Sequence, residues 1–232
     1  QTVSWNVNEK LQTGKYTWIH MGGEPDPSAP HEFLLSEDLL SPGMGDNSKL
    51  PQLDLVMNAM YRITLEGTDL AGNTGKKFVM SVVYDDVPPV LELKYPENNS
   101  AVNHLDISYS ISEQLSLGEI IYTEIGGDPD PNSPIIINLE SKELETSFDQ
   151  RQKTIQIPML NDGSIYNIQF KGEDLATNKA ESNLIESVKY DVTRPRIEIY
   201  YPTSNSYFMG SEINISISED LKDGKMVWTR TG

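Results

Sequence analysis

Apolar and polar residues alternate strictly in three short stretches of the chain, and these stretches match one another. They cover residues 3–9, 107–113 and 213–219, with Ser or Asn at most of the polar positions and a glutamate at the end of each. Alternation with a period of two is typical of an antiparallel strand that buries one face. The pattern therefore predicts three equivalent β-strands.

Further alternating stretches return at the same spacing and predict the other strands of each copy. These strands run over 15–20, 61–67 and 78–84 in the first copy, 90–94, 119–124, 166–172 and 184–190 in the second, and 196–200 and 225–230 in the third. Short helical turns are expected near 36–40 and 141–144. Many short strands at regular spacing, separated by Gly, Pro, Asn and Asp, indicate a β-sandwich or barrel.

The copies are long enough to be domains. Glu113 follows Glu9 by 104 positions, and Glu219 follows Glu113 by 106. The motif Gly-x-Asp-Leu-Ala-x-Asn ends at Asn73 in the first copy and at Asn178 in the second. A repeat of this length exceeds the roughly 20–50 residues of solenoid units, so each copy can bury a core of its own.

The repeat divides the chain into three predicted units. We expect 1–85 to lack the first strand of a unit, 86–191 to be complete, and 192–232 to be the truncated start of a third. A sequence cut within a repeat at both ends is expected to be a window on a longer array. The linkers at 85–89 and 191–195 are short and contain proline, which resists bending, so the array is expected to be a semi-rigid rod.

Aromatic positions refine the predicted fold. An aromatic residue recurs in the strand after the shared glutamate, at Trp18, Tyr122 and Trp228, and a tyrosine opens a later strand at Tyr61 and Tyr166. This arrangement favours an all-β chain of tandem immunoglobulin-like antiparallel sandwiches, with Tyr61 and Tyr166 in the tyrosine-corner position. The alternative is that both tyrosines are ordinary core residues.

Charge and composition restrict the partners. The net charge is −17, from 35 acidic and 18 basic residues, and cysteine is absent. Such a charge repels nucleic acid and anionic lipid and attracts divalent cations. No apolar run approaches the roughly 18 residues of a membrane span, so no membrane insertion is expected in this segment. Without disulfides, stability must come from buried cores, ions or neighbouring units.

The sequence contains no recognisable catalytic constellation. His20, His31 and His104 share no metal-ligand spacing, and the first two are replaced by Glu124 and Ile135 in the next copy. The stretch 43–45 has two glycines but lies in a polar loop without the strand and helix of a phosphate-binding site. We therefore expect a protein that is not an enzyme.

The predicted topology places acidic loops at the junctions between units. In an immunoglobulin-like sandwich, the loop after the second strand and the loop between the last two strands both lie at the end where the linker enters. The candidate inter-domain calcium ligands are Asp85, Asp86, Glu113, Asp174 and Asn178 at the first junction and Asp191 and Glu219 at the second. Calcium favours such oxygen donors. Alternatively, Glu113 is only solvated, and Asp174 and Asn178 only hydrogen-bond their own turn.

A second acidic loop is a weaker metal candidate. Asp128, Asp130 and Asn132 alternate with other residues as in a calcium loop, but the glycine and the distal glutamate of that motif are missing. The prolines at 129 and 131 also fit a stiff loop at the far end of the unit, where it would support the next copy.

Several runs resemble a known family. They are 18–31, the Gly-x-Asp-Leu-Ala-Gly-Asn motif that ends at Asn73, Tyr84-Asp85 before Pro88-Pro89, and 228–232. They look like the tandem bacterial immunoglobulin-like repeats of very large secreted or surface-anchored proteins, many of them adhesins. Copy two departs at Thr177, where copy one has glycine, and at Ile135. The resemblance implies an extracellular or cell-surface location and a spacer or adhesive role, but no particular ligand.

These observations lead to three functional hypotheses. The first is a structural spacer or stalk in adhesion or cell–cell contact, whose partners are neighbouring repeats, other copies of the chain in a fibre or bundle, and another cell's surface. The second is a module that binds a glycan or protein through loops 22–31 and 126–134. Most aromatics are predicted to be buried, however, and Tyr207 and Phe208 are expected to join a core. The third is a set of accessory domains of a larger secreted enzyme.

Overall fold

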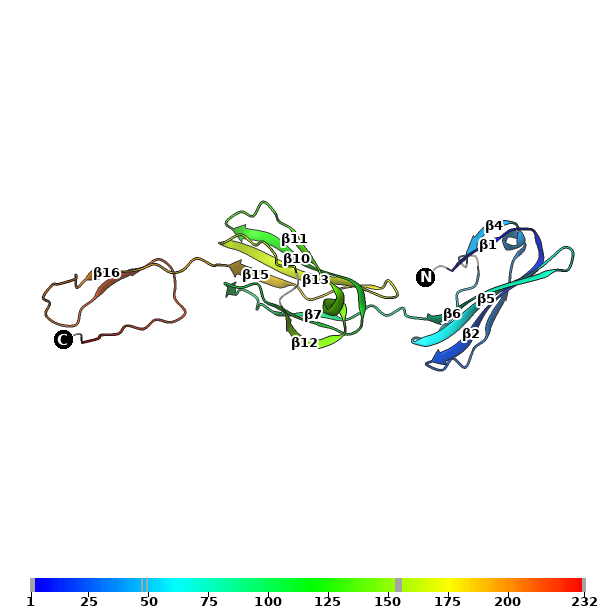
Figure 1. Cartoon of the computed structure of the whole chain (residues 1–232), viewed down its shortest axis with the longest axis horizontal. Coiled ribbons are helices and arrows are strands. Elements are labelled where there is room, and N and C mark those ends of the chain that lie inside the picture. Colours follow the sequence, from blue (N-terminus) through cyan, green and yellow to red (C-terminus); the bar gives the residue numbers. More distant parts are fainter. Residues whose placement is uncertain (1–2, 47, 49, 153–155, 231–232) are drawn as a thin grey trace.

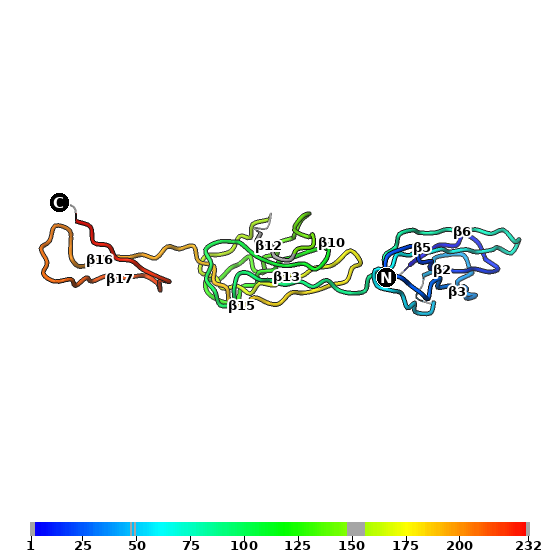
Figure 2. Tube along the Cα trace, turned by 90° about the horizontal axis from the view of Figure 1, so that it is seen from below, coloured from blue at the N-terminus to red at the C-terminus, as the bar shows by residue number. Residues whose placement is uncertain are grey.

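The computed structural model describes residues 3–46, 48, 50–152 and 156–230, without the side chains of 148–152. The first and last two residues of the predicted array, 1–2 and 231–232, lie outside this description. The regular secondary structure of the described chain consists of β-strands and short 3₁₀ turns, so the predicted all-β class is confirmed. The strands form three groups that follow one another along the longest axis (Figures 1 and 2).

The first group of strands forms two antiparallel sheets. Its elements are β1 (Ser4–Val7), β2 (Leu11–Gly23), β3 (His31–Leu34), the 3₁₀ turn η1 (Glu37–Leu40), β4 (Gly43–Asp46), β5 (Ala59–Asp69) and β6 (Thr74–Val83). One sheet has the order β3-β2-β5-β6, and the other pairs β1 with β4. Alternating side chains of β2 and β5, among them Tyr16, Trp18, Tyr61 and Ile63, form the buried core.

The second group has more strands. They are β7 (Leu91–Tyr95), β8 (Ala101–Val102), β9 (Ile107–Ile111), β10 (Leu115–Gly127), β11 (Ile135–Asn138), the 3₁₀ turn η3 (Ser141–Leu144), β12 (Ser147–Gln152), β13 (Ser164–Asp174), β14 (Lys179–Glu181) and β15 (Ile185–Tyr190). One sheet has the order β12-β9-β7, and the other has β11-β10-β13-β15-β8, with β14 also paired to β13. Their inner faces bury a separate core that includes Ile111, Tyr109 and Phe170.

The two groups repeat not only the strands but also their irregularities. The pairing of β2 with β5 shifts register between Leu11 and Thr13 and again between His20 and Gly22. The pairing of β10 with β13 shifts at the positions 104 residues later. The turns η1 and η3 also lie at matching places, as the sequence predicted. The same local sequence therefore gives the same local geometry in both groups.

The third group contains only a pair of strands among the described residues, β16 (Ile197–Tyr201) and β17 (Asn214–Ile217). The strand predicted over 225–230 was wrong, because the structure places no strand there. Its counterparts β2 and β10 are each paired on both edges. Residues 225–230 have no such neighbours in the described chain, and a strand without a ladder partner leaves its backbone groups to water.

Buried tyrosines tie a loop to each core. Tyr61 and Tyr166 are almost fully buried. The hydroxyl oxygen of each accepts a hydrogen bond from a backbone N–H five residues upstream, at 3.0 Å from Val56 and 2.8 Å from Asn161. Each hydroxyl then donates to a buried carboxylate, Asp26 at 2.7 Å or Asp130 at 2.5 Å. Such a bond to the backbone a few residues upstream is the hydrogen bonding expected of a tyrosine corner, and both tyrosines are also members of the buried cores.

Acid is expected to destabilise the chain through these carboxylates. Burial alone disfavours the charged form of Asp26, but hydrogen bonds from Tyr61 and His31 outweigh it and lower its pKa to about 2. A lowered pKa stabilises the folded state above the ordinary pKa of about 3.9, and this contribution is lost as the pH falls from about 4 to about 2. Urea midpoints between pH 7 and 2 measure the loss. Asp26→Asn should flatten the acid limb, and parallel limbs for both proteins would contradict the assignment.

Candidate junction site

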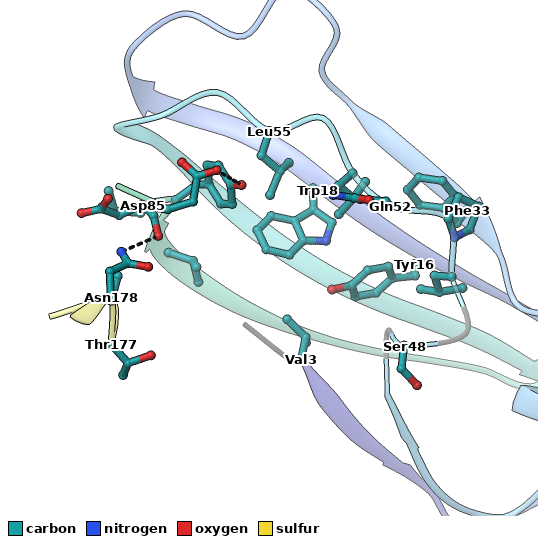
Figure 3. Close-up of a pocket in the computed structure, with 18 residues that line it drawn as sticks. Val3, Tyr16, Trp18, Phe33, Ser48, Gln52, Leu55, Asp85, Thr177 and Asn178 are labelled. Carbon is teal, nitrogen blue, oxygen red and sulfur yellow. Dashed lines mark hydrogen bonds between the residues drawn. The ribbon is translucent and has the colours of Figure 1, made fainter. Parts of the chain in front are cut away.

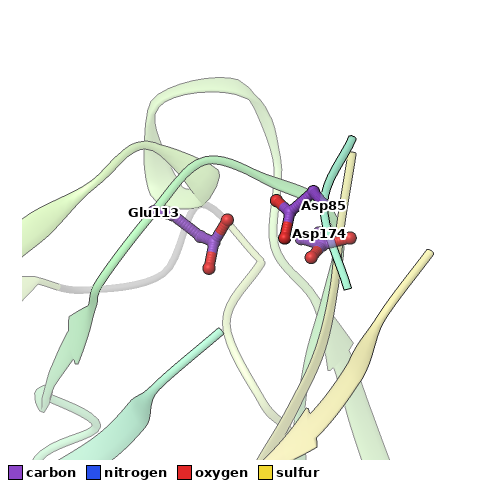
Figure 4. A group of neighbouring side chains, drawn as sticks. All are labelled: Asp85, Glu113 and Asp174. Carbon is purple, nitrogen blue, oxygen red and sulfur yellow. The ribbon is translucent and has the colours of Figure 1, made fainter. Parts of the chain in front are cut away.

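Three carboxylates converge where the first group of strands meets the second. Asp85 lies in the linker after β6, Glu113 follows β9, and Asp174 is the last residue of β13. One carboxylate oxygen from each lies within 4.8 Å of the others. Figure 4 shows the three neighbouring side chains. The sequence prediction had placed these three residues together, and the structure brings them into one cluster.

The turn that follows β13 fixes the position of Asp174. Its Oδ1 accepts hydrogen bonds from the backbone N–H groups of Ala176 at 2.7 Å and Asn178 at 2.9 Å, and its Oδ2 accepts from the side-chain amide of Asn178 at 2.8 Å. The Asp174 side chain is buried. Asp174 and Asn178 therefore do form hydrogen bonds within their own turn, as the alternative above supposed. These bonds hold the Asp174 carboxylate in place at the junction.

The first group contains the same turn without the cluster. There Asp69 accepts hydrogen bonds from the backbone of Ala71 and Asn73 and from the Asn73 side chain, each at 2.8 Å. Among the described residues, Asp69 belongs to no group of three acidic side chains. It therefore offers a natural comparison for Asp174.

The other residues predicted for this junction have different roles. The side-chain amide of Asn178 donates to the backbone carbonyl of Asp85 at 3.3 Å, which links the turn directly to the linker (Figure 3). Asp86 is turned to Tyr84, whose hydroxyl donates to its Oδ2 at 2.9 Å. The junction cluster is thus Asp85, Glu113 and Asp174, framed by Asn178.

The cluster carries uncompensated negative charge. Partial burial raises the pKa of Glu113, and the negative charges of Asp85 and Asp174 raise it further. None of the ion pairs found among the described residues includes any of the three. Close like charges without a counter-charge favour the binding of a cation.

The second junction is built differently. Lys189 Nζ lies 2.7 Å from Asp191 Oδ2. The hydrogen bond to Asp191 and its charge raise the pKa of Lys189, and the charge of Glu219 acts in the same direction. The predicted ligands Asp191 and Glu219 therefore face an ammonium group. At the first junction the position of Lys189 is occupied by Val83.

A carboxylate that the sequence reasoning missed also holds the second linker. Asp162 accepts hydrogen bonds from the backbone N–H of Val192 at 2.8 Å and from the hydroxyl of Thr193 at 2.5 Å. The corresponding residue of the first group is Met57. An alignment of the two copies could have shown this difference between the junctions, because Asp162 stands where the first copy has Met57 and Lys189 stands where it has Val83.

The weaker metal candidate is used within its own loop. Asp130 accepts from the Tyr166 hydroxyl and, through Oδ1, from the backbone N–H of Asn132 at 2.9 Å. The backbone carbonyl of Asp128 accepts from the Ser164 hydroxyl, while the Asp128 residue is exposed. Hydrogen bonding thus accounts for the buried carboxylate, and metal binding by Asp128, Asp130 and Asn132 stays a prediction.

A cavity of about 530 Å³ lies beside the first junction (Figure 3). Its walls come mainly from the first group, including Val3, Trp18, Leu55 and Val82, and its end is formed by the turn at 176–178. Its lining is mixed, because polar side chains such as Ser48 and Gln52 stand among the apolar ones and Asp85 and Asp86 line it at the linker.

The likeness of this chain to known proteins is weak. No helix among the described residues is long and apolar enough to cross a membrane. No protein-family model matches the chain. No curated protein matches it either. Among solved structures, the chain is similar to part of a 1.5-MDa bacterial ice-binding adhesin studied for host cell surface retention, with a TM-score of 0.30 and 12% identity. The match covers 88% of this chain and 62% of that one.

Proposed function

We propose that this chain is a non-enzymatic spacer segment of a large extracellular surface protein, built from immunoglobulin-like units in a semi-rigid row. We further propose that calcium stiffens the first junction. The observation that carries the proposal is the convergence of the linker residue Asp85 with Glu113 and Asp174. A cation held by these groups would connect the linker to the second unit.

The geometry of the cluster suits calcium. Calcium binds oxygen at about 2.3–2.6 Å, so two ligands on opposite sides of one ion lie about 4.6–5.2 Å apart. The 4.8 Å within which the three carboxylate oxygens fall matches one shared ion. Calcium takes six to eight oxygens, which three carboxylates supply in part by bidentate binding and water completes.

Two features of the linker support limited bending at this junction. Pro88 and Pro89 restrict the backbone before β7, and the bond from Asn178 to the Asp85 carbonyl attaches the linker to the turn after β13. The ion would add a third restraint at the same place. At the second junction, Lys189 and Asp162 provide restraints from the protein itself.

The immunoglobulin-like assignment is supported by the paired antiparallel sheets of the second group and by the tyrosine-corner bonds of Tyr61 and Tyr166. The extracellular location is what the resemblance of the sequence implies. A spacer needs repeated units and resistance to bending, and it needs no catalytic pocket.

Calcium binding is expected to weaken in acid. Calcium requires the charged form of Glu113, and the raised pKa of this residue means that protons begin to compete at a higher pH than for an ordinary glutamate. Calorimetric titration at pH 7.5 and pH 5 should show the lower affinity at pH 5. Glu113→Gln should weaken binding and remove most of this pH dependence, whereas the matched variant Glu9→Gln should behave as wild type. No heat of binding at pH 7.5 would overturn the calcium site.

A further inference from the structure

The matching loops after β2 and β10 contain peptide bonds of unusual chemical lability. They are Asp26-Pro27 in the first loop and Asp128-Pro129 and Asp130-Pro131 in the second. An aspartyl-prolyl bond is hydrolysed readily in mild acid, because the carboxyl group can attack its own backbone carbonyl and the proline nitrogen is a good leaving group. Such an attack within one residue needs no encounter of separate reactants. The surroundings of each aspartate therefore decide which bond is open to it.

The carboxylates of two of these aspartates are engaged. Asp26 and Asp130 are buried, and each accepts a hydrogen bond from the hydroxyl of its corner tyrosine, Tyr61 or Tyr166. Asp128 is exposed, and its carboxylate has no hydrogen bond or ion pair among the described residues. Of the three carboxyl groups, that of Asp128 is the one available to react.

The backbone around Asp128 is held by the turn that precedes β13. The N–H of Asp128 donates to the carbonyl of Gly163 at 3.2 Å, and the side-chain amide of Asn161 donates to the carbonyl of Pro129 at 3.3 Å. The hydroxyl of Ser164, which is fully buried, donates to the carbonyl of Asp128 itself. The labile bond is thus fixed on both sides, and the carbonyl open to attack already has a hydrogen-bond donor.

This donor is itself supported, and the first loop lacks it. The side-chain amide of Asn161 donates to Ser164 Oγ at 3.1 Å, and a hydroxyl that accepts one hydrogen bond donates the next more strongly. A donor already in place stabilises the negative charge that develops on a carbonyl oxygen under attack. In the first copy, Val56 and Ala59 stand at the positions of Asn161 and Ser164. The two loops therefore provide a comparison within one chain.

We propose that the bond between Asp128 and Pro129 is a self-cleavage site of the folded chain. The Asp128 carboxyl oxygen bonds to the Asp128 carbonyl carbon, the bond from that carbon to the Pro129 nitrogen breaks, and the carboxyl proton passes to this nitrogen. A cyclic anhydride remains on Asp128, and water opens it to the free acid in this exposed loop. Ser164 is the catalytic donor to the oxyanion. The reaction consumes one water molecule and no other reactant.

Cleavage at this bond would cut the backbone of the row without unfolding it. The bond follows the end of β10, and the neighbours of this strand in the sheet, β11 and β13, both come after the bond. The two pieces would stay joined through strand pairing and the core of the second group alone. A spacer cut in this way transmits tension through non-covalent contacts at one unit. This inference is independent of the calcium site.

The unmodified chain provides the first measurement. It is kept folded at about pH 5, where Asp26 still stabilises the fold, and is analysed by mass spectrometry after denaturation. Two fragments, 1–128 and 129–232, should accumulate, and their masses should add up to that of the chain plus one water molecule. In urea at the same pH, the preference for this bond over the other two aspartyl-prolyl bonds should fall about tenfold or more, because the Ser164 donor is lost.

Three variants with models in the first loop assign the roles. Asp128→Glu copies Glu24 and should stop cleavage, because glutamate must close a larger, slower-forming ring. Ser164→Ala copies Ala59 and should slow cleavage at this bond about tenfold or more without changing the rate at the other two. Glu24→Asp creates a new aspartyl-prolyl bond without the hydroxyl donor and should leave the first loop uncut in the folded chain.

Three results would overturn the proposal. The first is a folded chain that stays intact for as long as the unfolded chain needs to be cut. The second is cleavage of Ser164→Ala at the wild-type rate, with calorimetry showing that the variant is folded. The third is cleavage of the first loop in Glu24→Asp as fast as at Asp128, since it would show that the hydrogen bonds from the turn have no effect on the reaction.

Discussion

Removal of calcium with a chelator is expected to lower the melting temperature of the second group of strands by about 10–20 °C. Free calcium at about 100 times its Kd stabilises a folded site by about 2.7 kcal/mol. For a unit of about 100 residues, each kcal/mol changes the midpoint by about 4–8 °C. The effect arises because Asp85, Glu113 and Asp174 repel one another when no cation lies between them. Differential scanning calorimetry with calcium and with EGTA measures it.

A matched pair of variants separates the effect of the ion on stability from the effect of the turn. Asp174→Asn and Asp69→Asn make the same change in the matching turns of the second and the first group. Each keeps Oδ1 as the acceptor for two backbone N–H groups and replaces Oδ2, which accepts from the side chain of Asn178 or Asn73, with an amide donor. Only Asp174 belongs to the acidic cluster. Asp174→Asn should therefore abolish the calcium-dependent shift, while Asp69→Asn should lower stability but keep the shift. Identical curves in calcium and in EGTA for the wild-type chain would reject a structural ion.

Replacement of one core residue is expected to unfold one group of strands and leave the other intact. Phe170 is fully buried in the second core, and its ring centroid lies 5.2 Å from that of Tyr109. Phe170→Ala removes this packing and should cost about 3–5 kcal/mol. The two cores share no buried residue, so the first group should keep its own melting temperature.

The tryptophans make this separation measurable. The three tryptophans are Trp5, Trp18 and Trp228, and none lies in the second group. In Phe170→Ala, the fluorescence transition should stay where it is in wild type while the calorimetric transition of the second group moves down. Phe78→Ala, on the exposed face of β6, is a control that should have little effect on either. A fluorescence transition that moves together with the calorimetric one would show a single cooperative core.

The strands were predictable because alternation records which face of a strand is buried. Trp18, Tyr109 and Tyr166 were expected inside from this pattern, and they are buried. The same reasoning failed for the strand at 225–230 and for the core packing of Tyr207, which is fully exposed. Alternation shows that a segment can pair, but pairing and burial also need neighbours that the segment itself does not contain.

The junction cluster was predictable from topology, because strand direction alone places Glu113 and Asp174 at the end where Asp85 enters. The side-chain directions within it were not, since Asp86 turns to Tyr84. The pairing of Lys189 with Asp191 was missed because a lysine at a polar position of an alternating strand is expected to point into solvent. The replacement of Val83 in the first copy by Lys189 in the second thus places a positive charge at one junction and none at the matching position of the other.

The central claim is that consecutive units with separate cores are held in an extended row, and small-angle X-ray scattering tests it most directly. A compact protein of this length would have a radius of gyration of about 17 Å. In calcium, the chain is predicted to have a radius well above that value, at concentrations low enough to exclude oligomers. A value near that of a compact protein, both with calcium and with chelator, would contradict the account.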